Sequence, residues 1–130
     1  MYRWVEHTGE LELEIEAPTE QAVFEEGFEA MRELLSTDRS DDAPPWEVEL
    51  RAADRPALLA DWLAELAFLA ESEGLVPEKL ADLELSDAEL RAVVEGGKGE
   101  PPQLVKGVTY HRLTLEPAGG GFRASVVLDV

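Results

Sequence analysis

Oxygen-bearing side chains near both ends of the sequence could hold a hard cation. Glu10 follows the segment Glu6-His7-Thr8-Gly9, and Asp129 stands next to the last residue, Val130, whose terminal carboxylate is a further oxygen ligand. Carboxylates are groups that calcium prefers, but these lie far apart in sequence. A cation site is therefore possible only if the fold closes the two ends together. The alternative is that Glu10 belongs to a solvated strand face and Asp129 to a frayed terminus.

The strong negative charge limits the partners of this chain. Its 29 Asp and Glu residues outnumber 11 Lys and Arg, which gives a formal net charge of −18. Such a field repels phosphate backbones and anionic lipids, and it attracts cations and basic protein surfaces. Direct nucleic-acid binding and membrane association are therefore not expected, although acidic composition can also serve solubility alone.

Length and composition favour one small folded unit. The chain has 130 residues, 45% of them hydrophobic, which suits a single domain spanning residues 1–130. With no Cys, disulfides, zinc–thiolate sites and thiol nucleophiles are excluded. No signal-like segment or membrane-length apolar stretch is visible, so a soluble cytoplasmic protein is expected.

The apolar pattern predicts two strands at the start of the chain. Residues 2–6 form the first, and Thr8-Gly9 is a plausible turn. Apolar and acidic residues then alternate over residues 10–16, which is typical of an antiparallel sheet with one wet face. Glu10 should therefore point to the polar face.

Two amphipathic helices follow. Thr19 is placed to cap the first, Asp54 caps the second with Pro56 in its first turn, and Gly74 ends it. Helical spacing predicts buried stripes of Phe24, Phe28, Met31 and Leu35 in the first helix and of Leu59, Trp62, Leu63, Leu66 and Leu69 in the second.

The remaining segments are predicted to be mostly strand. A surface loop is expected at residues 36–45 and a Gly/Pro-rich loop at 96–102, with strands at 47–52, 75–85, 90–95, 104–115 and 121–130 and a hairpin connection at 117–120. In the last strand, Asp129 falls on the face opposite Phe122 and Leu128. The order of elements predicts an α+β two-layer sandwich with two helices packed on one face of a mixed or antiparallel sheet.

Four blocks of residues, in this order, resemble the archease family. They are Glu6 to Glu10, Leu63 to Leu66 with Glu73 to Leu75, Val105 to His111, and Val126 to Val130. Archeases are small acidic proteins that assist the RtcB-type RNA ligase, which seals tRNA exons and broken RNAs. The resemblance, which covers nearly the whole chain, implies a non-enzymatic accessory role in which the protein speeds guanylylation of the ligase's catalytic His with GTP and a metal.

The resemblance also implies a metal site. Archeases bind a divalent cation, described as calcium, through an acidic residue of a His-Thr-x-Asp motif, an Asp next to the C-terminus and the terminal residue. The matching residues are Glu10, Asp129 and Val130, with Glu10 standing where the archaeal pattern has Asp. Glu is longer by one methylene but remains a hard oxygen ligand. Calcium takes roughly six to eight oxygens, so waters or backbone carbonyls must complete the shell.

Three more residues are candidates for a supporting or partner-contact role. His7 could orient a ligand or transfer a proton, but a hydrogen-bonded structural role is the more common one for such a histidine. Lys106 and Tyr110 lie in the block that resembles the family, with no role derivable from chemistry. Tyr110 and His111 are neighbours in a predicted strand and should face opposite sides.

Two rival functions stay open. A small hydrolase could use Glu10 and Asp129 as a carboxylate pair, but the chain has no Gly-x-Ser-x-Gly, His-Glu-x-x-His or phosphate-binding glycine loop. A metal-independent acidic chaperone or scaffold could instead bind a basic client protein. Calcium-dependent thermal stability separates this alternative from the metal-dependent accessory role.

Overall fold

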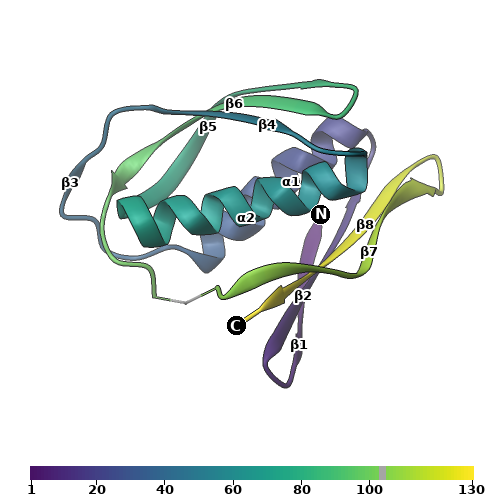
Figure 1. The fold of residues 1–130 in the computed structure, drawn as a ribbon, viewed down its shortest axis with the longest axis horizontal. Helices are drawn as coiled ribbons and strands as arrows, with labels where there is room; N and C mark the ends of the chain where they lie inside the picture. The colour runs from purple at the N-terminus through teal and green to yellow at the C-terminus, as the bar shows by residue number, and fades with distance from the viewer. Residues whose placement is uncertain (103–104) are drawn as a thin grey trace.

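The strands divide into two antiparallel sheets that enclose two helices (Figure 1). The structure is a computed structural model that describes residues 1–102 and 105–130. The elements in chain order are β1 (Tyr2–His7), β2 (Glu10–Ala17), α1 (Glu20–Leu34), β3 (Asp41–Asp42), β4 (Trp46–Arg51), α2 (Arg55–Glu73), β5 (Leu75–Ser86), β6 (Glu89–Lys98), β7 (Gly107–Ala118) and β8 (Gly121–Asp129). The predicted α+β class is confirmed.

The first sheet joins the two ends of the chain. Its strand order is β1-β2-β8-β7, so the second strand pairs directly with the last. In the second sheet, β6 pairs with β5 on one side and with β4 and the two-residue β3 on the other. In Figure 1 the helices lie between this second sheet and the first. The predicted helix layer is therefore present, and the strands that cover it form two sheets rather than one.

Local sequence signals define both helices. The Thr19 hydroxyl accepts a hydrogen bond of 3.0 Å from the Ala22 N–H, and the Asp54 carboxylate accepts one of 2.9 Å from the Ala57 N–H. Each bond satisfies a backbone donor that the first helical turn leaves free. Gly74 ends α2 in the left-handed conformation with φ of 67°, which costs glycine little. All three predicted signals are confirmed.

The core is formed where the helices meet the inner faces of both sheets. The predicted helix stripes are all buried, and Leu13 and Ile15 of β2 are fully buried beneath them. The rings of Phe28 and Trp62 stack with centroids 6.3 Å apart. The Trp62 indole N–H donates to the Phe24 carbonyl at 3.0 Å, so the one polar atom of this side chain is satisfied inside the core.

Several predicted loop boundaries were wrong, because residues assigned to loops belong to strands. The loop predicted at residues 36–45 contains β3, and β6 continues through Gly96 to Lys98. Glycine is required at position 96, because a Cβ there would collide with the Val76 carbonyl of the neighbouring β5. A glycine that permits this close approach resembles a loop residue in sequence.

The hairpin that ends the chain is tighter than predicted. Only Gly119 and Gly120 form the turn, with φ of 57° and 85°, which suits a two-residue hairpin loop. Pro117 and Ala118 instead belong to β7. The same strand begins at Gly107, and the first residue of the predicted strand 104–115 lies outside the described residues.

Among the described residues, neither helix combines the length and apolarity needed to cross a membrane.

Replacing Trp62 with Phe should destabilise the protein by about 2 kcal/mol, because the change removes buried ring volume and the hydrogen bond to the Phe24 carbonyl. Urea unfolding followed by circular dichroism measures the loss. The control is Phe68→Leu on the same helix, where the side chain is 55% exposed and the expected change is within about 0.5 kcal/mol. Equal losses in both variants would contradict the packing role of Trp62.

Candidate cation site at the end of the first sheet

One row of residues crosses all four strands of the first sheet. In this row His7 is opposite Glu10, Glu10 is opposite Asp129, and Asp129 is opposite Gly107. Directly opposite residues in antiparallel strands share a face, with Cβ atoms about 4.5–5.5 Å apart. The structure thus brings Glu10 and Asp129 side by side on the face turned away from the helices.

Backbone hydrogen bonds fix the end of the chain beside this row. The Val130 N–H donates to the Gly9 carbonyl at 3.1 Å, and the Lys106 N–H donates to the Asp129 carbonyl at 2.8 Å. Val130 therefore lies next to the turn that precedes Glu10 and directly follows Asp129. The Asp129 side chain is exposed, and that of Glu10 is 35% exposed.

Gly107 leaves one flank of Asp129 open. The position opposite Asp129 on β7 has no side chain, and a Cβ placed there would meet no atom within 4 Å. Solvent or a partner group can therefore reach the Asp129 carboxylate from this side.

A further acidic residue, Glu12, lies next to Glu10 on the same face of β2. Its carboxylate contacts the His7 Nε2 at 3.1 Å and accepts a hydrogen bond from the Ser125 hydroxyl at 2.7 Å. The hydrogen bond from Ser125, and then that with His7, lowers the pKa of Glu12 below its usual value. Glu12 is therefore held as a carboxylate, and His7 has a hydrogen-bonded partner.

A basic side chain reaches this acidic face from the edge strand. Arg112 of β7 lies 3.4 Å from the Glu10 Oε1 and 3.7 Å from the Glu12 Oε1. The segment that carries Arg112 is irregular. Thr109 pairs with Val127 and Thr114 pairs with Ser125, so β7 advances five residues where β8 advances two. The three extra residues form a bulge over residues 110–113, in which Arg112 has a φ of 60°.

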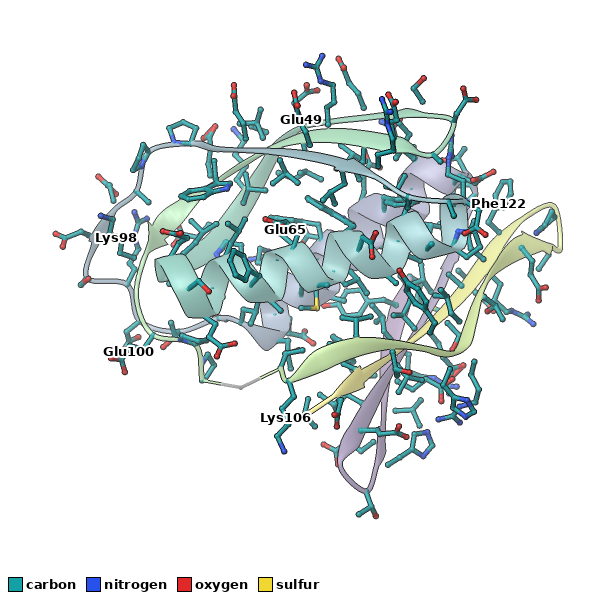
Figure 2. All side chains as sticks on the ribbon, in the orientation of Figure 1. Glu49, Glu65, Lys98, Glu100, Lys106 and Phe122 are labelled. Atoms are coloured by element: carbon teal, nitrogen blue, oxygen red, sulfur yellow. The ribbon has the colours of Figure 1, made fainter. Side chains whose placement is uncertain are left out.

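The other two candidates lie apart from the row of carboxylates. Tyr110 is 58% exposed, and its hydroxyl donates to the Asp61 carboxylate of α2 at 3.0 Å, on the helix side of the sheet. This hydrogen bond, together with desolvation, raises the pKa of Tyr110 above its usual value. The Lys106 side chain points away from the ribbon near the end of β8 (Figure 2). The contact between Lys106 and Asp129 is a hydrogen bond between backbone groups.

Comparison with known proteins supports the resemblance found in the sequence. The model of the Archease protein family matches residues 2–130. The chain belongs to the archease family. It is 32% identical over 139 residues to Protein archease of Methanosarcina mazei, covering 99% of this chain and 95% of the relative. It is also 32% identical over 136 residues to Protein archease of Methanopyrus kandleri, covering 97% and 96%.

Solved structures share the fold. The solution structure of Methanobacterium thermoautotrophicum protein 1598 has a TM-score of 0.75 and 25% identity, covering 99% of this chain and 98% of that one. The crystal structure of an archease from Thermotoga maritima, described as a possible chaperone, has a TM-score of 0.71 and 21% identity, covering 100% and 98%. The arrangement of helices and sheets in this archease-family chain is therefore one already seen in solved proteins.

The oxygen donors at the end of the sheet suit a hard cation in part. Within the described residues, no three side chains of His, Cys, Asp or Glu are arranged to hold a metal by themselves. Glu10 and Asp129 offer two carboxylates on adjacent strands, and Val130, whose N–H is bonded to the Gly9 carbonyl, carries further main-chain oxygens. An ion with flexible coordination, such as calcium, fits such a donor set when water completes its shell.

Glu12, Ser125 and Arg112 were not identified as site residues from the sequence. Alternation placed Glu12 on the same face as Glu10, and this was the available signal. The pairing between Glu12 and Ser125 depends on the tertiary partner of β2, and the reach of Arg112 depends on the bulge. Neither can be seen in a local pattern.

Replacing Glu12 with Gln should reduce stability in a pH-dependent way. Because the folded-state pKa of Glu12 is lowered, its stabilising contribution is present above the unfolded-state pKa and is lost as the pH falls through the folded value. We expect a deficit of about 1 kcal/mol at pH 7 that shrinks towards zero as the pH falls through the lowered folded-state pKa of Glu12. Urea unfolding of both proteins at several pH values measures it.

The matched control is Glu14→Gln, which makes the same charge change on the same face of β2. Glu14 pairs with Arg3 at 2.7 Å, and the side chains are 40% exposed for Glu14 and 70% exposed for Arg3. Ion pairs this exposed contribute little to stability. A Glu12 variant as stable as wild type at neutral pH would show that the bonds to His7 and Ser125 do not stabilise the fold.

Proposed function

We propose that this archease-family protein is an accessory activator of an RtcB-type RNA ligase. It promotes guanylylation of the ligase with GTP and so supports tRNA splicing or RNA repair. Family membership over residues 2–130 supports the partnership. The observation that carries the mechanism is the pairing of Glu10 with Asp129, which places two carboxylates on the exposed end of one sheet.

These residues are proposed to hold a divalent cation, with calcium as the first choice. Glu10 and Asp129 supply carboxylate oxygens, and Val130 supplies main-chain oxygens. The cation would offset the repulsion between the two opposed acids and provide open coordination positions. The protein's own contribution is to fix the separation of the carboxylates on adjacent strands.

Charge supports a basic protein surface as the partner. The formal net charge of −18 attracts cationic surfaces and speeds their encounter, and it disfavours direct contact with RNA. A ligase that binds GTP and RNA phosphates needs basic residues around its active site. In this proposal the acidic end of the first sheet approaches that region, with Gly107 leaving Asp129 accessible. The ligase performs the chemistry, and this protein is not an enzyme.

A metal-independent chaperone or scaffold is the second candidate. The Thermotoga maritima structure is described as a possible chaperone, and Arg112 already offsets part of the charge of Glu10 and Glu12 without a metal. In that case calcium would leave the melting temperature unchanged. A calcium-dependent rise in melting temperature favours the metal-dependent mechanism.

Replacing Asp129 with Asn should abolish stimulation of ligase guanylylation and the calcium-dependent rise in melting temperature, because one of two carboxylate ligands loses its charge. Incorporation of labelled GMP into the ligase, with the metal varied, measures the first effect, and thermal unfolding measures the second. The circular dichroism spectrum should be unchanged, since the side chain is exposed.

The control is Asp82→Asn, which removes the same charge from an exposed position on β5 of the other sheet. This variant should stimulate the ligase as wild type does. Normal stimulation by the Asp129 variant would sink the metal mechanism while leaving the partnership intact. No stimulation by the wild-type protein with any divalent ion would refute the partnership.

A further inference from the structure

We propose that Arg112 is the built-in counter-ion of the cation site and determines how strongly and how selectively the site binds cations. The inference rests on the proposed cation site at Glu10 and Asp129, and it adds a residue and a selection mechanism to it. Without a bound ion, the guanidinium neutralises the acids. A cation enters by displacing the guanidinium from Glu10.

The contacts of Arg112 are suited to exchange. Its guanidinium is 3.4 Å from Glu10 and 3.7 Å from Glu12, both longer than the 2.7–2.9 Å or so of a close charge-assisted hydrogen bond. The Arg112 side chain is also 44% exposed, so water can replace its contacts. A guanidinium held this loosely can leave, whereas one buried in a tight bidentate pair could not.

The path of this side chain explains an unusual burial. Strand β8 lies between β7 and β2, so Arg112 must cross β8 to reach the acids. Val127 of β8 is the residue in the same row as Glu12 and Thr109, on the face turned away from the helices, yet it is 0% exposed. In this proposal the aliphatic stem of Arg112 lies over Val127 and covers it, because Arg stems commonly cover apolar surface.

The bulge in β7 directs the side chain across the sheet. Arg112 has a φ of 60°, in the left-handed region that non-glycine residues seldom adopt, and it is one of four residues between the pairs formed by Thr109 and Thr114. The Thr109 hydroxyl accepts a hydrogen bond of 3.0 Å from the His111 N–H and ties down the start of the bulge. Bulges of this kind re-aim side chains at functional sites.

Because a cation must displace the Arg112 guanidinium, the charge of the cation determines whether it binds. A monovalent ion brings no more charge to Glu10 than the guanidinium it displaces, whereas a divalent ion brings twice as much. The ion also contacts Asp129, for which no hydrogen bond or ion pair of the side chain is found among the described residues. The structure therefore favours divalent over monovalent cations, and the affinity for calcium is lower than the carboxylates alone would give.

Calcium titration by calorimetry on the full chain tests the proposal. Arg112→Met keeps an apolar stem over Val127 and removes the charge, so calcium should bind about tenfold more tightly than to wild type. Arg112→Lys restores the charge and should return the affinity towards that of wild type. The control Arg123→Met removes an equal charge from the same face of the sheet, where Arg123 pairs with Glu16 at 3.3 Å, and should change the affinity less than twofold or so.

A second measurement follows the side chain itself. In methyl NMR spectra, calcium should shift the Val127 signals of the wild-type protein, because the arginine stem moves. The shift should be small in Arg112→Met, whose neutral side chain stays in place. Wild-type and Arg112→Met proteins with the same calcium affinity would overturn the role of Arg112 and leave the cation site standing. No binding of calcium to either protein would refute the site and the counter-ion together.

Discussion

The antiparallel pairing of β2 with β8 determines both the core and the candidate site. Eight residue pairs run without interruption from Glu10 and Asp129 to Ala17 and Phe122. The inner face of this pairing buries Leu13, Ile15, Ala124, Val126 and Leu128. Each large apolar side chain contributes about 1.5–3 kcal/mol on burial, whereas the repulsion between directly opposed like charges is about 1 kcal/mol or less. The core therefore sets the register, and two carboxylates are held together although they repel one another.

The β7 bulge places polar side chains on both faces of the first sheet. Within the four residues of the bulge, Tyr110 bonds to Asp61 on α2, whereas Arg112 contacts the carboxylates of Glu10 and Glu12 on the opposite face. A regular strand would point residues two apart to the same side. Here the left-handed conformation of Arg112 breaks that rule. In the part of the chain that the structure describes, β7 is the last strand of its sheet, and this edge position allows the three extra residues to be accommodated.

Most of the fold could be predicted because its signals are local. The caps at Thr19 and Asp54, the stop at Gly74 and the alternation along β2 each depend on neighbouring residues, and each is confirmed. The meeting of Glu10 and Asp129 was expected as a condition of the cation hypothesis and is present in the structure. Whether these residues bind calcium stays a prediction.

What could not be predicted depends on partners distant in sequence. Gly96 reads as a loop residue, but it lies in β6 because the Val76 carbonyl approaches too closely for a side chain. The division of the strands into two sheets follows from packing on both sides of the helices. The bulge at residues 110–113 cannot be predicted from the sequence, because this segment contains no Gly or Pro. Arg112 therefore could not be assigned to the site.

The difference between the two arms of the last hairpin limits where this protein can change in length. Strand β8 is bonded on both sides, so inserting or deleting one residue within it would turn every following side chain to the wrong face of two strand interfaces at once. Within the described residues, strand β7 has one neighbouring strand, and it already carries three extra residues. Over evolution, insertions and deletions in this hairpin should therefore accumulate in β7, and the shape of the surface around the acids can diversify while their spacing stays constant.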